Sequence, residues 1–295
     1  MARIGFIGLG NMGLPMAVNL IKAGHTVEGV DVNPATVDKL KAAGGTGVEF
    51  AKVAAARADV VITMLPAGKQ VREVYLGAGG IVENANEGTL LIDCSTIDVE
   101  TARAVASAAE KKGLLMLDAP VSGGVGGATA ATLTFMVGGS AQAYTRALSI
   151  LEKMGKTIVH AGGPGNGQAA KICNNMILGV SMIAVSEAFV LAEKLGLDHQ
   201  KLFDISSKSS GQCWSMTSYC PVPGPVPTSP ANRDYAAGFT AAMMLKDLKL
   251  SQDAAKASGA KTALGAEAER IYSSYVESGE AGKDFSGIIR FIRRR

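Results

Sequence analysis

The stretch RIGFIGLGNMG (residues 3–13) lies near the start of the chain, and Asp31 directly follows a second short apolar run, Thr26–Val30. This pattern predicts a strand, a tight glycine turn, a helix, a second strand and then a carboxylate. Gly8 permits the sharp turn, Gly10 leaves space for a pyrophosphate beside the backbone, and Gly13 lets the helix pack close to the sheet. The pyrophosphate would lie at the helix N-terminus, where free N–H groups favour an anion. The stretch therefore predicts a dinucleotide-binding unit, with a purely structural turn as the alternative.

Asp31 bears on which dinucleotide this unit would bind. Its carboxylate can accept hydrogen bonds from the ribose hydroxyls of the adenosine, and it would repel a 2′-phosphate. The residues that follow, Val32, Asn33 and Pro34, include no Arg or Lys that would attract one. The sequence therefore favours NAD over NADP.

Composition bounds the class of protein. The chain has 295 residues, enough for two domains, and 47% of them are hydrophobic, which excludes a disordered chain. The formal net charge is +3, but four arginines lie in the last six residues. The excess positive charge is therefore confined to the C-terminal end and does not indicate a basic surface patch. We therefore expect no nucleic-acid partner.

Cysteine and histidine usage argues against a disulfide framework and a metal site. The four cysteines form no Cys-x-x-Cys pair, and the three histidines are isolated. No apolar run free of charges reaches the ~20 residues of a membrane span, and we expect no targeting segment before the first strand. We expect a cytoplasmic protein with no bound metal and no membrane partner.

The first half of the chain alternates apolar strand patterns with helical ones. This rhythm predicts an α/β fold with a parallel, doubly wound sheet, whose ligands bind beyond the carboxyl ends of the strands. Leu65-Pro66 and Ser95-Thr96 follow two of the predicted strands and would face the same crevice as the glycine loop. The predicted strands are Arg3–Ile7, Thr26–Val30, Val60–Met64, Thr89–Asp93, Leu114–Leu117, Thr132–Val137 and Thr157–Val159, with helices at Gly13–Ala23 and Thr101–Lys112 among those between them.

The rhythm ends at a glycine-rich boundary, residues 162–167. We predict a dinucleotide-binding domain over residues 1–163 and an all-helical domain for substrate binding and oligomerisation over residues 164–295, joined by a long interdomain helix. Five of the ten prolines fall in residues 221–230, which predicts an extended loop, either a lid or a plain connector. The predicted helices are 168–194, His199–Lys208, Thr240–Ser258 and Ala263–Ser278.

Three clusters of residues could carry chemistry. Residues 118–124 (DAPVSGG) follow a strand, and their glycines and Ser122 could hold a carboxylate, although a plain turn explains them too. Lys171 and Asn175 share a helix face in an apolar stretch, where a half-buried lysine can serve as an acid or base. The alternative is a lysine that reaches solvent. Taken alone, Lys246-Asp247 indicates no function.

Together these motifs resemble the β-hydroxyacid dehydrogenase family over nearly the whole chain. The family's glycine fingerprint, its D-x-P-V-S-G-G motif, its G-x-x-x-K-x-x-x-N motif and its K-D-L motif match residues 8–13, 118–124, 167–175 and 246–248. Asn174 stands where phosphogluconate-type relatives carry His, which disfavours a phosphorylated sugar acid. Cys220 stands where related dehydrogenases usually carry Asn, a departure in the predicted loop that bears on substrate preference and not on reaction type.

The resemblance implies an NAD-dependent oxidoreductase of short 3-hydroxy acids, foremost 3-hydroxyisobutyrate in valine catabolism. L-serine or another short 3-hydroxy acid is the alternative substrate, and a non-catalytic NAD-binding protein is the alternative class. The resemblance makes Lys171 the general acid and base, and we expect a homodimer or homotetramer. The expected substrate contacts are Ser122, Gly123, Gly124, Lys171, Asn175, Trp214 and Asp247; the expected cofactor contacts are Gly8, Leu9, Gly10, Asn11, Met12, Gly13, Asp31, Val32, Asn33, Leu65, Pro66, Gln70, Thr96 and Lys246.

Overall fold

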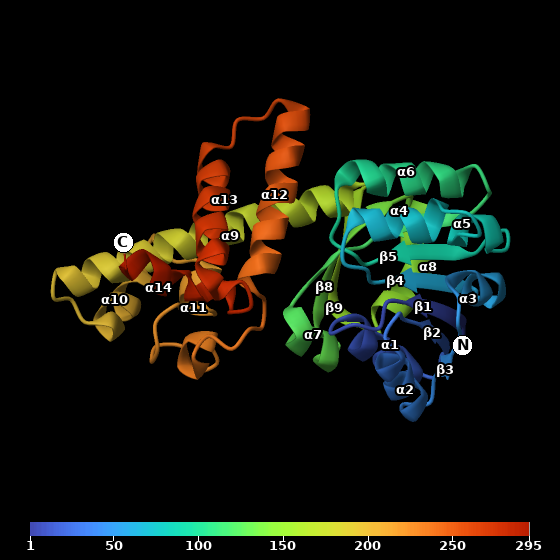
Figure 1. The fold of residues 1–295 in the computed structure, drawn as a ribbon, viewed down its shortest axis with the longest axis horizontal. Helices are drawn as coiled ribbons and strands as arrows, with labels where there is room; N and C mark the ends of the chain where they lie inside the picture. The colour runs from blue at the N-terminus through green and yellow to red at the C-terminus, as the bar shows by residue number, and fades with distance from the viewer. Residues whose placement is uncertain (295) are drawn as a thin grey trace. The chain divides into compact units, whose positions relative to one another are not determined.

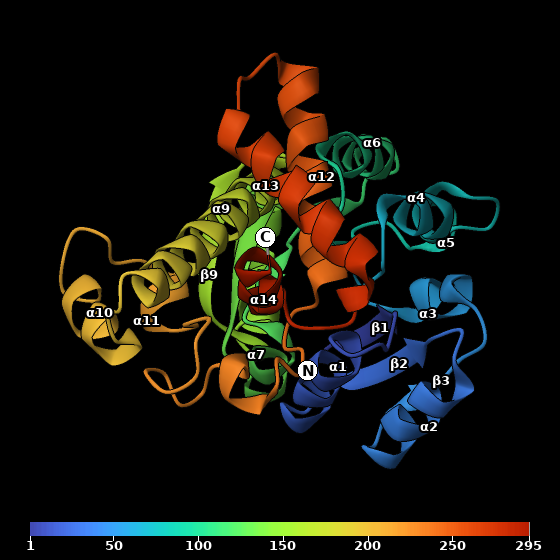
Figure 2. The ribbon, with the colours of Figure 1, turned by 60° about the vertical axis from the view of Figure 1, so that its left-hand side comes forward.

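The structure, a computed structural model, describes residues 1–294 (Figures 1 and 2). The chain forms two compact units: unit 1 is Met1–Lys171, and unit 2 begins at Ile172. Each unit has its own buried apolar core.

Unit 1 is built on one nine-stranded sheet with the order β3-β2-β1-β4-β5-β6-β8-β7, and β9 pairs with β8. The central pairs, from β3 across to β6, are all parallel, as the alternating pattern predicted. The strands are β1 (Arg3–Ile7), β2 (Thr26–Val30), β3 (Thr46–Gly47), β4 (Val60–Thr63), β5 (Leu90–Asp93), β6 (Leu115–Asp118), β7 (Val121–Ser122), β8 (Leu133–Gly139) and β9 (Gly155–Gly162).

The sheet is not parallel throughout, which corrects the prediction of a parallel sheet in one region. β8 runs antiparallel to both β6 and β7. Between β7 and β8 the chain has only the seven-residue helix α7 (Gly124–Ala130) and a short turn. A parallel return needs a crossover of about a dozen residues or more, so the chain comes back in the opposite direction.

Helices cover both faces of this sheet, as a doubly wound fold requires (Figure 1). On one face α1 (Gly13–Lys22), α2 (Pro34–Ala42), α7 and α8 (Ala141–Leu151) pack against the strands. The other face is covered by α3 (Ala51–Arg57), α4 (Gly68–Leu76), α5 (Ile81–Asn84) and α6 (Val99–Glu110). Because both faces are buried, β4 and β5 are buried along their whole length.

Unit 2 is helical. Figure 2 shows α12 and α13 side by side, and their apolar faces pack with residues of α9 into one core. The α-helices are α9 (Asn166–Lys194), whose first turn belongs to unit 1, α10 (His199–Ser206), α11 (Trp214–Thr217), α12 (Ala241–Ser258), α13 (Ala263–Tyr275) and α14 (Ile288–Arg293), with the 3-10 segments η1 (Pro230–Arg233) and η3 (Phe285–Gly287) and the π-type turn η2 (Val276–Glu280).

By length and composition alone, α9 could cross a membrane, and within residues 1–294 it is the one helix with this property. Of its most apolar window, 44% is buried inside the protein. Met182, Val185 and Phe189 on this helix belong to the cores of unit 2. Its apolar character therefore has a packing role in the fold itself.

The proline-rich stretch packs in part into the core of unit 2. Cys220, Val222 and Val226 are buried with the α9 residue Phe189, and Ser229 Oγ donates a hydrogen bond to the Cys220 carbonyl over 2.6 Å. Burial raises the pKa of the Cys220 thiol to about 11. The stretch is therefore packed against the rest of unit 2, and its contacts include Cys220, the residue that departs from the family pattern.

Candidate active site

The glycine loop between β1 and α1 has the geometry that a dinucleotide needs. A Cβ at Gly8, whose φ is +95°, would lie 2.2 Å from the Met64 carbonyl oxygen, and a Cβ at Gly13 would lie 1.9 Å from that of Gly8. These two positions admit only glycine because the backbone itself fills the space. A Cβ at Gly10 would meet nothing within 4 Å. Gly10 therefore faces open space next to the helix start, which fits a pyrophosphate lying against the backbone.

The two glycines should respond differently to the same substitution. We expect Gly13→Ala to destabilise the protein by about 2 kcal/mol or more, because its Cβ would clash with the backbone. Gly10→Ala should leave the melting temperature nearly unchanged and weaken NAD binding about 10-fold or more. Thermal melts without cofactor and calorimetric titration with NAD measure the two effects. Equal loss of stability in both variants would contradict the assignment of Gly10 to the ligand.

Asp31 is held by the backbone of this region. Its Oδ2 accepts a hydrogen bond from the Leu9 N–H over 2.6 Å, and its Oδ1 accepts one from the Asn33 N–H over 2.8 Å. The Leu9 side chain is fully buried. A carboxylate has about four acceptor positions, so Asp31 keeps capacity for ribose hydroxyls. Val32, directly beside it, is fully exposed.

The other predicted cofactor contacts in unit 1 follow β1, β4 and β5, whose carboxyl ends lie at one edge of the sheet. The Leu65 N–H donates to Ser95 Oγ over 2.8 Å, so the loops after β4 and β5 are tied together. Asn11, Pro66 and Gln70 are exposed, while Met12 and Thr96 are half-buried.

Lys171 lies in the second turn of α9 and is 7% exposed. Its Nζ donates a hydrogen bond to the Val121 carbonyl over 2.8 Å. Val121 directly precedes Ser122, Gly123 and Gly124, and these two glycines have φ values of +128° and +61°. Successive turns of this kind can direct backbone N–H groups towards an anion. The structure therefore brings the predicted general base next to the predicted carboxylate-binding loop.

Asp118 and Gln168 hold the start of α9, a role that the sequence reasoning missed. Asp118 Oδ1 accepts from the Gly165 N–H over 2.7 Å, and its Oδ2 accepts from the Gln168 N–H over 2.9 Å. Burial raises the pKa of Asp118 to about 6, against the lowering effect of these backbone hydrogen bonds. The available signal was an acidic residue directly after a strand and an amide in an otherwise apolar helix.

The raised pKa predicts how stability depends on pH. Between pH 3.8 and about 6 the unfolded chain releases the Asp118 proton while the folded protein keeps it, so rising pH favours unfolding. The free energy of unfolding of the wild type, relative to Asp118→Asn, should fall by about 2 kcal/mol from pH 4 to pH 7. Urea titrations of both proteins across this range measure the difference. A difference that grows with pH would mean that the backbone N–H groups outweigh burial.

In unit 2, Asn175, Asp247 and Lys246 form a second cluster. Asn175 and Asp247 are each 2% exposed, and Asn175 Nδ2 donates to Asp247 Oδ2 over 2.5 Å. Lys246 Nζ lies 3.2 Å from Asp247 Oδ1. The Lys-Asp pair, which indicated no function by itself, thus orients the amide one helical turn after Lys171.

Trp214 of unit 2 is held by an aromatic contact. Its ring is half exposed and stacks on Tyr219, with 4.8 Å between the centroids. The Tyr219 hydroxyl donates to Asp284 Oδ2 over 2.9 Å, and Asp284 is completely buried. Asp284 therefore supports the position of the tryptophan, which the sequence gave no reason to expect.

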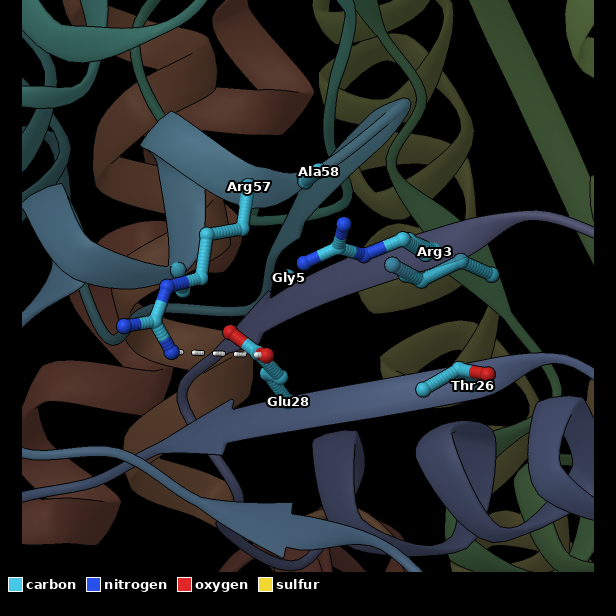
Figure 3. A pocket seen from close by; sticks show the side chains of 8 residues that line it. Arg3, Gly5, Thr26, Glu28, Arg57 and Ala58 are labelled. Carbon is cyan, nitrogen blue, oxygen red and sulfur yellow. Dashed lines mark ion pairs between the residues drawn. The ribbon is translucent and has the colours of Figure 1, made fainter.

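Figure 3 shows a small pocket in unit 1. Its lining includes Arg3, Thr26, Glu28 and Arg57, with Arg57 Nη1 3.9 Å from Glu28 Oε1. Arg3 and Thr26 begin β1 and β2, whereas the glycine loop follows the other end of β1. None of the predicted site residues lines this pocket. Across residues 1–294 no group of three or more His, Cys, Asp or Glu side chains is placed to hold a metal.

Comparisons with known proteins identify relatives of both halves of the chain. Residues 3–163 match the family described as the NAD binding domain of 6-phosphogluconate dehydrogenase, and residues 165–292 match that described as NAD-binding of NADP-dependent 3-hydroxyisobutyrate dehydrogenase. The chain is 49% identical to a Pseudomonas aeruginosa 3-hydroxyisobutyrate dehydrogenase, over 99% of each chain. It is 48% identical to an NAD-dependent L-serine dehydrogenase of the same organism, over 97% of this chain and 96% of that one.

Solved structures give the same result. A Mycobacterium tuberculosis 3-hydroxyisobutyrate dehydrogenase, solved with L-serine, superposes with a TM-score of 0.95 at 52% identity and covers 99% of each chain. Identity at this level over the full length covers the glycine loop, the lysine helix and the helical unit together. The chain belongs to the β-hydroxyacid dehydrogenase family of NAD-binding oxidoreductases.

Proposed function

We propose that the protein oxidises 3-hydroxyisobutyrate to methylmalonate semialdehyde with NAD as the hydride acceptor. The observation that carries the proposal is the buried Lys171 Nζ, held by the Val121 carbonyl directly beside Ser122-Gly123-Gly124. A short 3-hydroxy acid has its carboxylate and its hydroxyl two carbon atoms apart. One end can therefore lie in the Ser122 loop while the other meets Lys171.

Lys171 is the general base of this proposal. In its neutral form the amine keeps one N–H on the Val121 carbonyl and offers its lone pair to the substrate hydroxyl. The hydroxyl proton passes to Nζ as the carbon gives up a hydride, and the C–O bond becomes a carbonyl. In the reverse direction Nζ returns the proton to the carbonyl oxygen. When bound, NAD supplies the hydride-accepting chemistry.

The proposal also assigns roles to three groups in unit 2. Asn175 presents an amide whose orientation is set by Asp247, which suits it to orient the substrate. Lys246 is proposed to contact the cofactor, and Trp214 to exclude water from the substrate. The cofactor contacts proposed in unit 1 are those of the glycine loop, Asp31, Val32, Asn33 and the loops at Leu65, Pro66, Gln70 and Thr96.

The proposal also covers the roles of the two domains, the oligomeric state and the cellular location. We propose that residues 1–163 bind NAD and that residues 164–295 form the helical domain for substrate binding and oligomerisation, in a homodimer or homotetramer, with the Ser122 loop of the first domain completing the substrate site. Exposed apolar side chains on α9, such as Ile177 and Leu191, support an association between copies. A cytoplasmic enzyme of valine catabolism is the setting that this substrate implies.

L-serine is the second candidate substrate. It is named for the Pseudomonas aeruginosa relative at 48% identity, and the Mycobacterium tuberculosis structure was solved with it. It also carries a carboxylate and a hydroxyl two carbon atoms apart, and differs by an amine in place of a methyl group. The same residues would perform the same chemistry on it.

An assay of reduced-cofactor formation distinguishes these candidates. The purified protein is tested with (S)-3-hydroxyisobutyrate, L-serine, 3-hydroxypropionate and 6-phosphogluconate, each with NAD and with NADP. We expect the highest kcat/KM with 3-hydroxyisobutyrate and NAD. A preference for L-serine would keep the mechanism and change the substrate. NAD binding without turnover of any substrate would contradict the proposal and favour a non-catalytic NAD-binding protein.

A further inference from the structure

The backbone at the start of α9 packs directly against the backbone at the ends of β6 and β8. A Cβ at Gly167 would lie 2.4 Å from the Met136 carbonyl oxygen and 2.5 Å from that of Asp118. A Cβ at Gly138 would lie 2.6 Å from the Gly167 nitrogen. This close approach lets Asp118 accept the two N–H groups of Gly165 and Gln168, which a helix start otherwise leaves without partners.

Gln168 continues this attachment to the next strand. Its side chain is completely buried, although it lies on a helix and makes its bonds to residues more than 70 positions away. Nε2 donates to the Ser95 carbonyl over 2.7 Å, and Oε1 accepts from the Ile97 N–H over 3.1 Å. Both hydrogen-bonding ends of the amide are thus bonded to the loop after β5.

The same loop reaches the region where the cofactor is proposed to bind. Ser95 Oγ accepts from the Leu65 N–H over 2.8 Å and donates to Asp93 Oδ1 over 2.5 Å. A continuous set of hydrogen bonds therefore runs from the loop after β4, through Ser95, to Gln168. Lys171 lies three residues further along, one turn of the same helix.

We propose that Gln168 and Asp118 are positioning residues for Lys171. They attach the first turn of α9 to the ends of β5 and β6, and so fix Nζ relative to the loops at Leu65 and Ser122. The inference rests on the proposed function. Its physical basis is that proton and hydride transfer depend on placement within about 1 Å, and a misplacement of that size costs about 100-fold in rate.

The test replaces the amide group of Gln168 with side chains of similar volume. Gln168→Met removes both side-chain hydrogen bonds, whereas Gln168→Glu keeps an acceptor for the Ile97 N–H but turns a carboxylate oxygen towards the Ser95 carbonyl, which repels it. We expect kcat to fall by about 10- to 100-fold in Gln168→Met and by at least as much in Gln168→Glu. The deuterium isotope effect on kcat, with substrate labelled at the carbinol carbon, should rise as hydride transfer becomes limiting. The KM for NAD should stay within about twofold, since Gln168 is placed to position Lys171 rather than to bind cofactor.

Ser140→Ala is the matched control. It removes the side-chain cap of α8, which accepts from the Ala143 N–H over 3.2 Å, and Ser140 is outside the proposed machinery. It should lower stability without changing kcat or the isotope effect. If Gln168→Met does no more than Ser140→Ala, the role of Gln168 is structural and the inference is overturned. Should Gln168→Met fail to fold, Gln168→Glu and Asp118→Asn are measured in its place and judged in the same way.

A second readout does not depend on turnover. Reductive methylation with formaldehyde, followed by mass spectrometry, reports how readily Lys171 Nζ leaves the Val121 carbonyl. We expect Lys171 to react at least about 10-fold faster in Gln168→Met than in the wild type, with exposed Lys194 as the internal reference. If the wild type oxidises no hydroxy acid, the proposed function fails. The methylation rate alone then decides whether Gln168 positions Lys171. A rate equal to that of the wild type would overturn the inference.

Discussion

Replacing Lys171 by Ala is expected to lower kcat by at least about 100-fold, the largest effect of any single substitution considered for this protein. Lys171 is buried and its Nζ is held by the Val121 carbonyl, so its removal takes away the amine that is proposed to accept the substrate proton. The KM for NAD should change little, because the lost group acts on the substrate hydroxyl. Steady-state kinetics with 3-hydroxyisobutyrate and NAD measure both quantities.

Lys194→Ala provides the control for this prediction, because Lys194 is an exposed lysine at the other end of the same helix. It should leave kcat unchanged. Adding a small primary amine should restore part of the lost rate in Lys171→Ala, since the truncated side chain leaves space beside Val121. Near-normal turnover in Lys171→Ala would show that another group transfers the proton.

Exchanging the Asp31-Val32 pair for Ser-Arg is expected to raise the ratio of kcat/KM for NADP to that for NAD by at least about 100-fold. The substitution removes a carboxylate that would repel a 2′-phosphate and supplies a guanidinium that can bind one bidentately. Val32 is fully exposed, so an arginine there needs no change in packing. A serine at position 31 keeps an oxygen that can accept from the Leu9 N–H, which Asp31 now does over 2.6 Å.

Val32→Ala alone should leave the ratio of kcat/KM for NADP to that for NAD as it is, because it changes no charge near the position of the 2′-phosphate. Kinetics of the wild type, the single variant and the double variant with both cofactors complete the comparison. If the wild type uses both cofactors equally, or if the double variant keeps the preference for NAD, Asp31 does not select the cofactor.

Much of the fold follows from local patterns. The strands β1 and β2 and the helix α12 lie within a residue or two of their predicted bounds, because buried parallel strands are short apolar runs and helices have a clear repeat. The antiparallel direction of β8 was not foreseen, since its sequence is apolar whichever way it runs. The packing of the proline-rich stretch was left open, because prolines exclude a helix without saying what the loop contacts.

The candidate site divides in the same way. The glycine loop, Asp31 and the pair Lys171 and Asn175 were predicted from spacing, because each belongs to one strand–turn–helix–strand unit or to one helix face. By sequence alone, the Lys246-Asp247 pair indicated nothing, and Gln168 and Asp284 were not singled out. The bonds of Asn175 to Asp247 and of Gln168 to Ser95 join residues more than 70 positions apart, a distance over which no local pattern extends.

By itself, therefore, the sequence determined the doubly wound strand-and-helix order, the dinucleotide loop and the residue types able to move a proton and hold a carboxylate. These depend on turn sterics, on periodicity and on intrinsic side-chain chemistry, which neighbouring residues decide. Only the tertiary structure decided that Lys171 is bonded to Val121, that Asp118 and Gln168 fix the start of its helix, and that Asp247 orients Asn175. Those contacts exist because packing brings distant segments together and leaves buried polar groups that must find partners there.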